Sequence, residues 1–394
     1  MTAAPQAAWK PEALVEDERG RGVPAVVRFG PYLFVAGSDG YRSLQDERID
    51  PKLAENAIEQ CRNSYGRVAR RLERAGYGGD CAIWIENFTS GQHWRLERMA
   101  LWPEYFGEEN HERAVSFGAQ TRMDGINMLT SIVMAIDPAL ERRVAVPAPH
   151  RGRASRCTRV GPFTFVIGVR GGEDPVTKEA APEETPGSFD LQLDNAFKWL
   201  ASHLGRDENV PENFLRVDAT MRAARFIPRF EAAVRQRFGG KIPFASYAIG
   251  TPLGGHHEQE LGGVAIIPGE KKSVFWSNDG SVADATTGGG LVFLRSVSGV
   301  VDEKSGKILK DSYGDTRAQT AQAVRNVETL LSKAGSSLER VVRLDVFLKD
   351  IYAQDEVVDA LRGKFGSCGP AISFLGCEPR NLAEVEMIAI AGAA

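Results

Sequence analysis

The sequence of 394 residues predicts an α+β fold built from three copies of one unit. A Phe-Gly pair that closes a helix-like segment recurs at residues 106–107, 238–239 and 365–366. A short strand-like segment follows each pair, and its next-to-last residue is always a serine: Ser116, Ser246 and Ser373. Marks that recur in one order at nearly equal intervals indicate internal repeats.

Each copy begins with a strand of a predicted hairpin. Residues 28–37 (RFGPYLFVAG) and 159–168 (RVGPFTFVIG) share a Gly-Pro pair and a final glycine, and residues 287–296 (TGGGLVFLRS) form a looser third version. A long helix follows and is expected to stop at a glycine, because glycine readily adopts the left-handed conformation found at helix ends. These glycines are Gly76, Gly205 and Gly335.

The second half of the copy is clearest at residues 343–361 (RLDVFLKDIYAQDEVVDAL). Alternate residues from 344 to 348 are apolar, which predicts a strand, and Val357, Val358 and Leu361 have helical spacing. The serine-containing strand and terminal strands then complete the copy. We expect the three copies to span residues 20–140, 150–269 and 272–394.

The composition argues against several classes of protein. The formal net charge is −4, and no basic stripe with interleaved aromatic residues suggests a nucleic-acid partner. No apolar run is long enough to span a bilayer, and the N-terminal residues lack the apolar core of a secretion signal. The five cysteines are scattered without CxxC spacing, which predicts neither disulfides nor a structural zinc site. A cytoplasmic protein with a small-molecule partner is therefore expected.

The order of elements resembles that of the RidA/YjgF (Rid) superfamily. The likeness is clearest in the third copy, in VRLDVFLKDIYAQDEVVDAL, GPAISF and AEVEMIAIA. Rid proteins are usually homotrimers of single domains with a chorismate-mutase-like fold, and their small-molecule sites lie in clefts between neighbours. The resemblance implies three tandem Rid-like repeats that form an intramolecular pseudo-trimer with three non-identical clefts. It also implies that no cofactor is needed, and that the chain is a monomer or a dimer of such pseudo-trimers.

The deaminases of this superfamily hydrolyse reactive enamines and imines. An arginine in a Pro-Ala-Arg-Ser motif holds the substrate carboxylate, and a glutamate of the last strand positions water. The residues that match this arginine are aliphatic and cannot form a bidentate guanidinium clamp: Val115, Ala245 and Ile372. Either the substrate lacks the carboxylate, or another arginine supplies the clamp, for which the candidates are Arg122, Arg170, Arg222 and Arg295.

The position of the glutamate is kept better than that of the arginine. It matches Thr130 in the first copy, Glu260 in the second and Glu386 in the third, with Glu384 as a fallback. We expect Glu260 and Glu386 to be catalytic, because desolvation in a cleft favours the protonated carboxyl group that can deliver a proton. The residues expected to line the same clefts are Ser246, Tyr247, Ser373 and Cys377.

The chain end SFLGCEPRNLAEVEMIAIAG also resembles that of the chorismatases, hydrolases of the enol ether of chorismate that contain Rid-like repeats. In these enzymes a cysteine precedes a terminal-strand glutamate that acts as the general acid. The resemblance implies the same role for Glu386 beside Cys377, with pyruvate as a product.

The segment GGHHEQELGG (254–263) contains two of the six histidines. On a strand His256, Glu258 and Glu260 share one face, which could bind a divalent cation. The alternative is a solvated polar loop that leads into a strand. We prefer an interpretation without metal, in which His256 or His257 relays protons beside Glu260, because histidine titrates near neutral pH.

The sequence thus predicts a cofactor-independent hydrolase or deaminase that acts on an imine, an enamine or an enol ether. Protonation of such a bond creates an electrophile that water attacks, so one carboxylate and an orienting cleft suffice. Two alternatives stay open: a chorismatase-like hydrolase that releases pyruvate, and a non-catalytic Rid-like binding protein, which the missing arginines favour. The acidic charge balance argues against the RNA cleavage ascribed to some Rid proteins.

Overall fold

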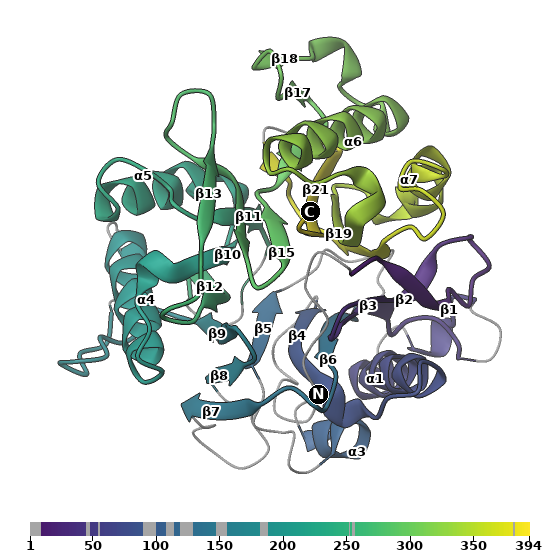
Figure 1. Ribbon diagram of the computed structural model, residues 1–394, viewed down its shortest axis with the longest axis horizontal. Coiled ribbons are helices and arrows are strands. Elements are labelled where there is room, and N and C mark those ends of the chain that lie inside the picture. The colour runs from purple at the N-terminus through teal and green to yellow at the C-terminus, as the bar shows by residue number, and fades with distance from the viewer. Residues whose placement is uncertain are drawn as a thin grey trace.

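The computed structural model describes residues 9–44, 48–53, 56–89, 100–107, 114–118, 129–146, 156–181, 188–251, 253, 257–380 and 383–394. In these residues, three mixed sheets surround a common centre and helices cover their outer faces (Figure 1). The α+β class expected from the sequence is confirmed. None of the described helices combines the length and the apolar character needed to cross a bilayer.

The first sheet is formed by six strands, which lie in the order β1 (Glu12–Glu16), β2 (Pro24–Phe29), β3 (Tyr32–Asp39), β6 (Leu129–Ile136), β4 (Ala82–Thr89) and β5 (Ala114–Gly118). Its outer face carries α1 (Ala57–Arg74) and the short α3 (Trp102–Phe106). The strands pair antiparallel except β4 and β5, which are parallel and therefore need the α3 crossover between them.

The second sheet repeats this order with β7 (Arg142–Val146), β8 (Cys157–Val160), β9 (Phe163–Val169), β12 (Gln259–Ile266), β10 (Phe214–Met221) and β11 (Ala245–Gly250). Its helices are α4 (Ser188–Gly205) and α5 (Ile227–Arg237). The parallel pair is again the last one, β10 with β11.

The third sheet has the same order in β13 (Ser273–Trp276), β14 (Ala283–Gly288), β15 (Leu291–Leu294), β21 (Val385–Gly392), β19 (Val341–Leu348) and β20 (Ala371–Gly376). The strand β16 (Val297–Ser298) also pairs with β21, and β17 (Val301–Asp302) forms a small hairpin with β18 (Lys307–Ile308). The helices are α6 (Thr316–Lys333) and α7 (Gln354–Leu361). The strand and helix predicted within residues 343–361 are therefore confirmed as β19 and α7.

Two of the three helix ends expected at glycine follow the prediction. Gly76 and Gly335 lie just beyond α1 and α6 with φ of +85° and +71°. α4 also ends at the expected glycine, Gly205, but the left-handed conformation expected of this residue was wrong, because it does not have a positive φ. Hydrogen bonds from residues 206–209 back to the end of this helix continue its turn past Gly205, and the left-handed conformation is adopted by Glu208, with φ of +57°.

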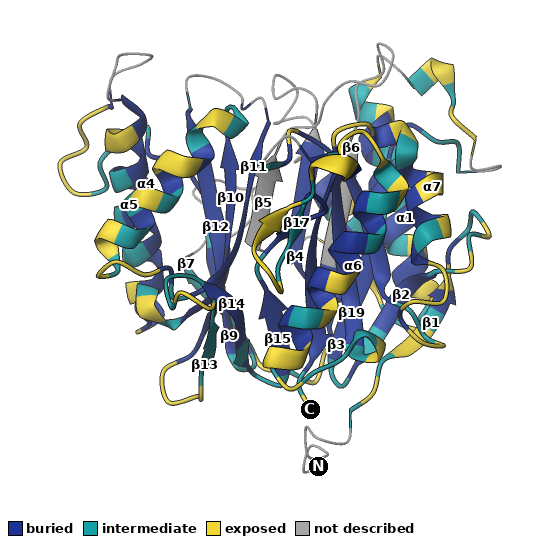
Figure 2. Ribbon diagram, turned by 90° about the horizontal axis from the view of Figure 1, so that it is seen from above, coloured by how far each residue is buried: buried dark blue, intermediate teal, exposed yellow. Residues whose placement is uncertain are grey.

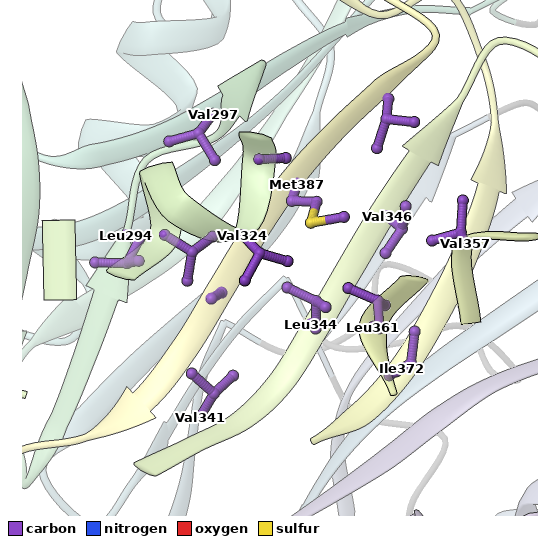
Figure 3. Packing of buried hydrophobic residues seen from close by; sticks show 14 of the residues in the cluster. Leu294, Val297, Val324, Val341, Leu344, Val346, Val357, Leu361, Ile372 and Met387 are labelled. Atoms are coloured by element: carbon purple, nitrogen blue, oxygen red, sulfur yellow. The ribbon is translucent and has the colours of Figure 1, made fainter. Parts of the chain in front are cut away.

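Each sheet buries one face against its own helices. In the third sheet, Val324 of α6 and Leu361 of α7 pack onto strand residues such as Leu344 and Met387 (Figure 3). Figure 2 shows the same arrangement around the molecule, with buried residues on the strands and exposed residues on the outer sides of the helices. The other faces of the sheets meet at the centre, where Trp84, Phe163 and Phe293 belong to one apolar cluster.

Next to Trp84 of this apolar cluster, the centre contains a buried charge network, defined as Glu86, Arg216, Asp218, Arg343 and Asp345. Nε of Arg343 donates to both oxygens of Asp345 at 2.9 Å, and Nη2 of Arg343 donates to Glu86. Nε of Arg216 donates to Asp218 at 2.6 Å, and its Nη2 lies 3.7 Å from Asp345. Burial raises the pKa of Asp218 to about 7, against the lowering effect of Arg216. The three central strands β4, β10 and β19 are thus joined by ion pairs.

A buried histidine in α4 gives the protein a pH-dependent stability. Burial, with Arg156 and Arg206 adding to it, lowers the pKa of His203 from 6.5 to about 4. Because the folded pKa lies below the unfolded one, the stabilisation is complete above pH 6.5 and is lost as the pH falls from 6.5 towards 4.

We therefore expect the loss of unfolding free energy between pH 7.5 and pH 5 to be smaller in His203→Gln than in the wild type, by roughly 1–3 kcal/mol. Urea titrations of the wild type and the variant at pH 7.5 and at pH 5 measure the loss of unfolding free energy in each protein. Equal losses in the two proteins would show that His203 does not titrate between these values.

Candidate functional site

The expected clefts correspond to the seams between neighbouring sheets. The last strand of each sheet lies against the hairpin strands of the next: β5 against β9, β11 against β14 and β15, and β20 against β2 and β3. At two seams the serine-containing strand is hydrogen-bonded across the boundary. The hydroxyl of Ser373 accepts from Gly37 N at 2.9 Å, and the carbonyl of Ser246 accepts from Ser296 N at 3.0 Å. Ser246 and Ser373 therefore do lie at seams, but at different ones.

Glu386 lies at the seam between the second and third sheets. It is on β21, and its carboxylate is 1% exposed. Oε2 accepts from the backbone N–H of Arg380 at 2.9 Å, and Oε1 accepts from Nε of the same arginine at 3.1 Å. Arg380 thus donates a hydrogen bond to each oxygen of this buried carboxylate.

Arg380 extends from the loop between β20 and β21 across this seam. Nη2 donates to the hydroxyl of Ser296 at 2.6 Å, and Nη1 binds Glu231 of α5 at 2.7 Å. The loop itself is held to the second sheet, because Glu378 and Gly250 exchange two backbone hydrogen bonds of 2.9 and 3.1 Å. The Arg380 side chain remains 20% exposed, so solvent reaches this end of the Glu386 site.

Cys377 is buried next to Glu386. Burial and the negative charges of Glu386 and Glu378 raise the pKa of the Cys377 thiol well above its ordinary value. The thiol is therefore neutral at physiological pH, which suits a packing or hydrogen-bonding role better than a nucleophilic one. Cys377 also belongs to a small apolar cluster that contains Tyr247 and Phe347.

Glu260 occupies the seam between the first and second sheets. It is on β12 and nearly fully buried, and Oε2 accepts from Nε of Arg170 at 2.6 Å. Arg170 follows β9 directly, so the hairpin strand supplies the arginine here, whereas a loop supplies it at Glu386. A Cβ atom at Gly168 would lie 2.1 Å from Oε1 of Glu260, which explains why β9 has a glycine at this point.

Arg222 and His257 lie beside the start of β12. Nε of Arg222 donates to the His257 carbonyl at 3.2 Å and lies 3.6 Å from Glu258, with which it forms an ion pair. Among the described residues, no group of three His, Cys, Asp or Glu side chains is arranged to hold a metal ion. Arg122 and His256 lie outside the described residues.

The remaining candidates point elsewhere. Tyr247 faces the centre, where its hydroxyl donates to Glu86 at 3.4 Å and burial raises its pKa. Arg295 binds Asp284 at 2.9 Å and Glu303 within the third sheet's own hairpin region. The structure thus brings Glu386 and Cys377 together, pairs Glu260 with Arg170, and separates these two groups into different seams.

Two residues of the Glu386 site were missed by the sequence analysis. Arg380 stands six residues before Glu386 in CEPRNLAEVE, but nothing in the local pattern indicates that it folds back onto the glutamate. Glu231 is 149 residues from Arg380 in sequence, and its position in an ordinary amphipathic helix gives no signal at all.

Comparison with known proteins gives the family. A family model described as Endoribonuclease L-PSP matches residues 284–392. A RutC family protein of Pyrococcus horikoshii is 32% identical over 92 residues, which are 23% of this chain and 70% of that protein. The chain belongs to the RutC/Rid family. The mitochondrial protein mmf1 of Schizosaccharomyces pombe is 32% identical to this Rid protein over 75 residues, 19% of the chain and 43% of mmf1.

Two solved structures that are similar to this Rid protein differ in how much of its chain they match. The yeast protein YEO7 is matched over its whole length but over 32% of this chain, with 24% identity and a TM-score of 0.29. A chorismatase is matched over 79% of this chain and 93% of its own, with 14% identity and a TM-score of 0.49.

Proposed function

We propose that this Rid protein consists of three tandem Rid-like repeats, at residues 20–140, 150–269 and 272–394, arranged as an intramolecular pseudo-trimer. The identical strand order of the three sheets around one centre supports this division. We further propose that the seam between the second and third repeats is the active cleft of a cofactor-independent hydrolase for a small imine, enamine or enol ether.

The observation that carries this proposal is the pairing of a buried carboxylate, Glu386, with a partly exposed guanidinium, Arg380. In the proposed reaction the Glu386 carboxylate accepts a hydrogen bond from water and orients it towards the electrophilic carbon. A proton from solvent adds to the imine nitrogen or to the β-carbon of the enamine or enol ether, and water then adds to the resulting cation while Glu386 accepts one of its protons. The adduct collapses to a carbonyl as Glu386 passes this proton to the departing ammonia or alcohol, and the proton left on the carbonyl oxygen returns to solvent. Arg380 would supply the guanidinium that is missing from the serine-containing strands.

The proximity of Cys377 to Glu386 supports chorismatase-like chemistry as a second candidate within the same class. A third candidate is a binding protein without catalysis. It is supported by the protein contacts of Arg380, because each of its three guanidinium nitrogens already donates a hydrogen bond to a side chain of the protein.

The first test is the incubation of the purified full chain with chorismate and, separately, with enamines generated in situ. Pyruvate release from chorismate would support the enol-ether reaction, and ammonia release would support the deaminase reaction. If neither product forms faster than in the absence of protein, the enzymatic proposal is contradicted. The non-catalytic binding protein is then the remaining candidate.

A further inference from the structure

The guanidinium of Arg380 is shared between two carboxylates from different parts of the fold. Its inner side binds the buried Glu386 through Nε. Its outer side binds Glu231 of α5 through Nη1 at 2.7 Å, and the Glu231 side chain is 26% exposed. The outer position on Arg380 is therefore both occupied by a carboxylate and accessible from solvent.

Glu231 is not committed to Arg380 alone. Its other oxygen lies 3.7 Å from Arg235, one turn further along α5, and both of these side chains are partly exposed. Exposed ion pairs of this kind exchange readily, because water solvates the separated charges. If Glu231 leaves Arg380, it keeps a cationic neighbour and access to water, so no unpaired charge becomes buried.

We propose that Glu231 occupies the place of a ligand carboxylate on Arg380, so that it is an internal competitor that sets the affinity of the cleft for anionic ligands. This inference rests on the proposed function, because it assigns a role within the same cleft. A ligand carboxylate would replace one charge-assisted hydrogen bond at Nη1 by another of the same kind. The buried Glu386 and Ser296 keep the guanidinium in position during this exchange.

The other arginine–glutamate pair differs in this respect. Arg170 binds Glu260 through Nε, but its buried Nη2 has no hydrogen-bond partner among the residues that the structure describes. Among the described residues, these two pairs therefore differ, and the carboxylate on the outer side of the arginine is seen at the seam that contains Arg380.

The test measures the binding of pyruvate and of its uncharged counterpart, methyl pyruvate, to the full chain by ligand-observed NMR. Glu231→Gln removes the competing charge, so its Kd for pyruvate should be about three- to tenfold lower than that of the wild type. The Kd for methyl pyruvate should not change. Arg380→Gln should lose the preference for pyruvate over the ester. Asp190→Asn, which breaks the exposed ion pair between Asp190 of α4 and Arg229 of α5, is the matched control and should behave as the wild type.

Three results would overturn the inference: unchanged or absent pyruvate binding in Glu231→Gln, equal tightening of the ester, or a retained pyruvate preference in Arg380→Gln. Circular dichroism confirms that each variant is folded, and Glu231→Ala replaces Glu231→Gln if the latter is not. Since the readout is binding, it is independent of turnover. Inactivity of the wild type towards every substrate would remove the proposed function alone, whereas a failed competition with normal turnover would remove this inference alone.

Discussion

Glu386→Gln is expected to lower turnover of the active substrate class by about 100- to 10,000-fold, the range observed when a general acid or base is removed. Glutamine keeps the shape of the side chain, and its single amide oxygen can accept one of the two hydrogen bonds that Arg380 donates, but it neither accepts nor delivers a proton. Steady-state kinetics measure kcat and KM, and a loss confined to kcat would indicate that the carboxylate acts in the chemical step.

Two further variants make this experiment decisive. Glu384→Gln replaces the neighbouring carboxylate, which binds Lys349 at 3.0 Å outside the seam. If Glu384→Gln loses turnover and Glu386→Gln does not, the catalytic role belongs to Glu384. Glu260→Gln tests the other seam in the same way. Full activity in all three variants would contradict carboxylate catalysis by this protein.

Arg343→Met is expected to destabilise the protein by about 3–5 kcal/mol, because it removes one partner from a buried ion-pair network. Glu86 and Asp345 would lose the guanidinium that binds both, while staying nearly fully buried. These two buried carboxylates would then have to be protonated, or the centre would have to open to water. Urea denaturation of wild type and variant at pH 7 measures the difference.

The matched control for this variant is Arg362→Met. Arg362 binds Asp359 at 3.0 Å, but its side chain is 69% exposed. An exposed pair contributes about 0–1 kcal/mol, so the control should unfold close to the wild type. Similar destabilisation by both substitutions would mean that the contribution of the central network to the free energy of unfolding does not depend on its burial.

The recurrence of the sequence marks agrees with the arrangement of elements because those marks are local. Alternation around Leu344 and helical spacing around Val358 are set by neighbouring residues, and β19 and α7 form where they predict. Gly205 shows the limit of such rules, since the chain beyond it continues the turn of α4 through its own hydrogen bonds.

By itself, the sequence determined the class of fold, the order of elements and the strands on which Glu260 and Glu386 lie. It did so because strand and helix periodicity are properties of short segments. Only the tertiary structure decided the partners of these carboxylates. Arg380 and Glu231 are 149 residues apart, and Arg343 and Glu86 are 257 residues apart. Such pairs arise where separate sheets meet, and the packing of whole sheet faces, not any local pattern, determines which side chains meet there.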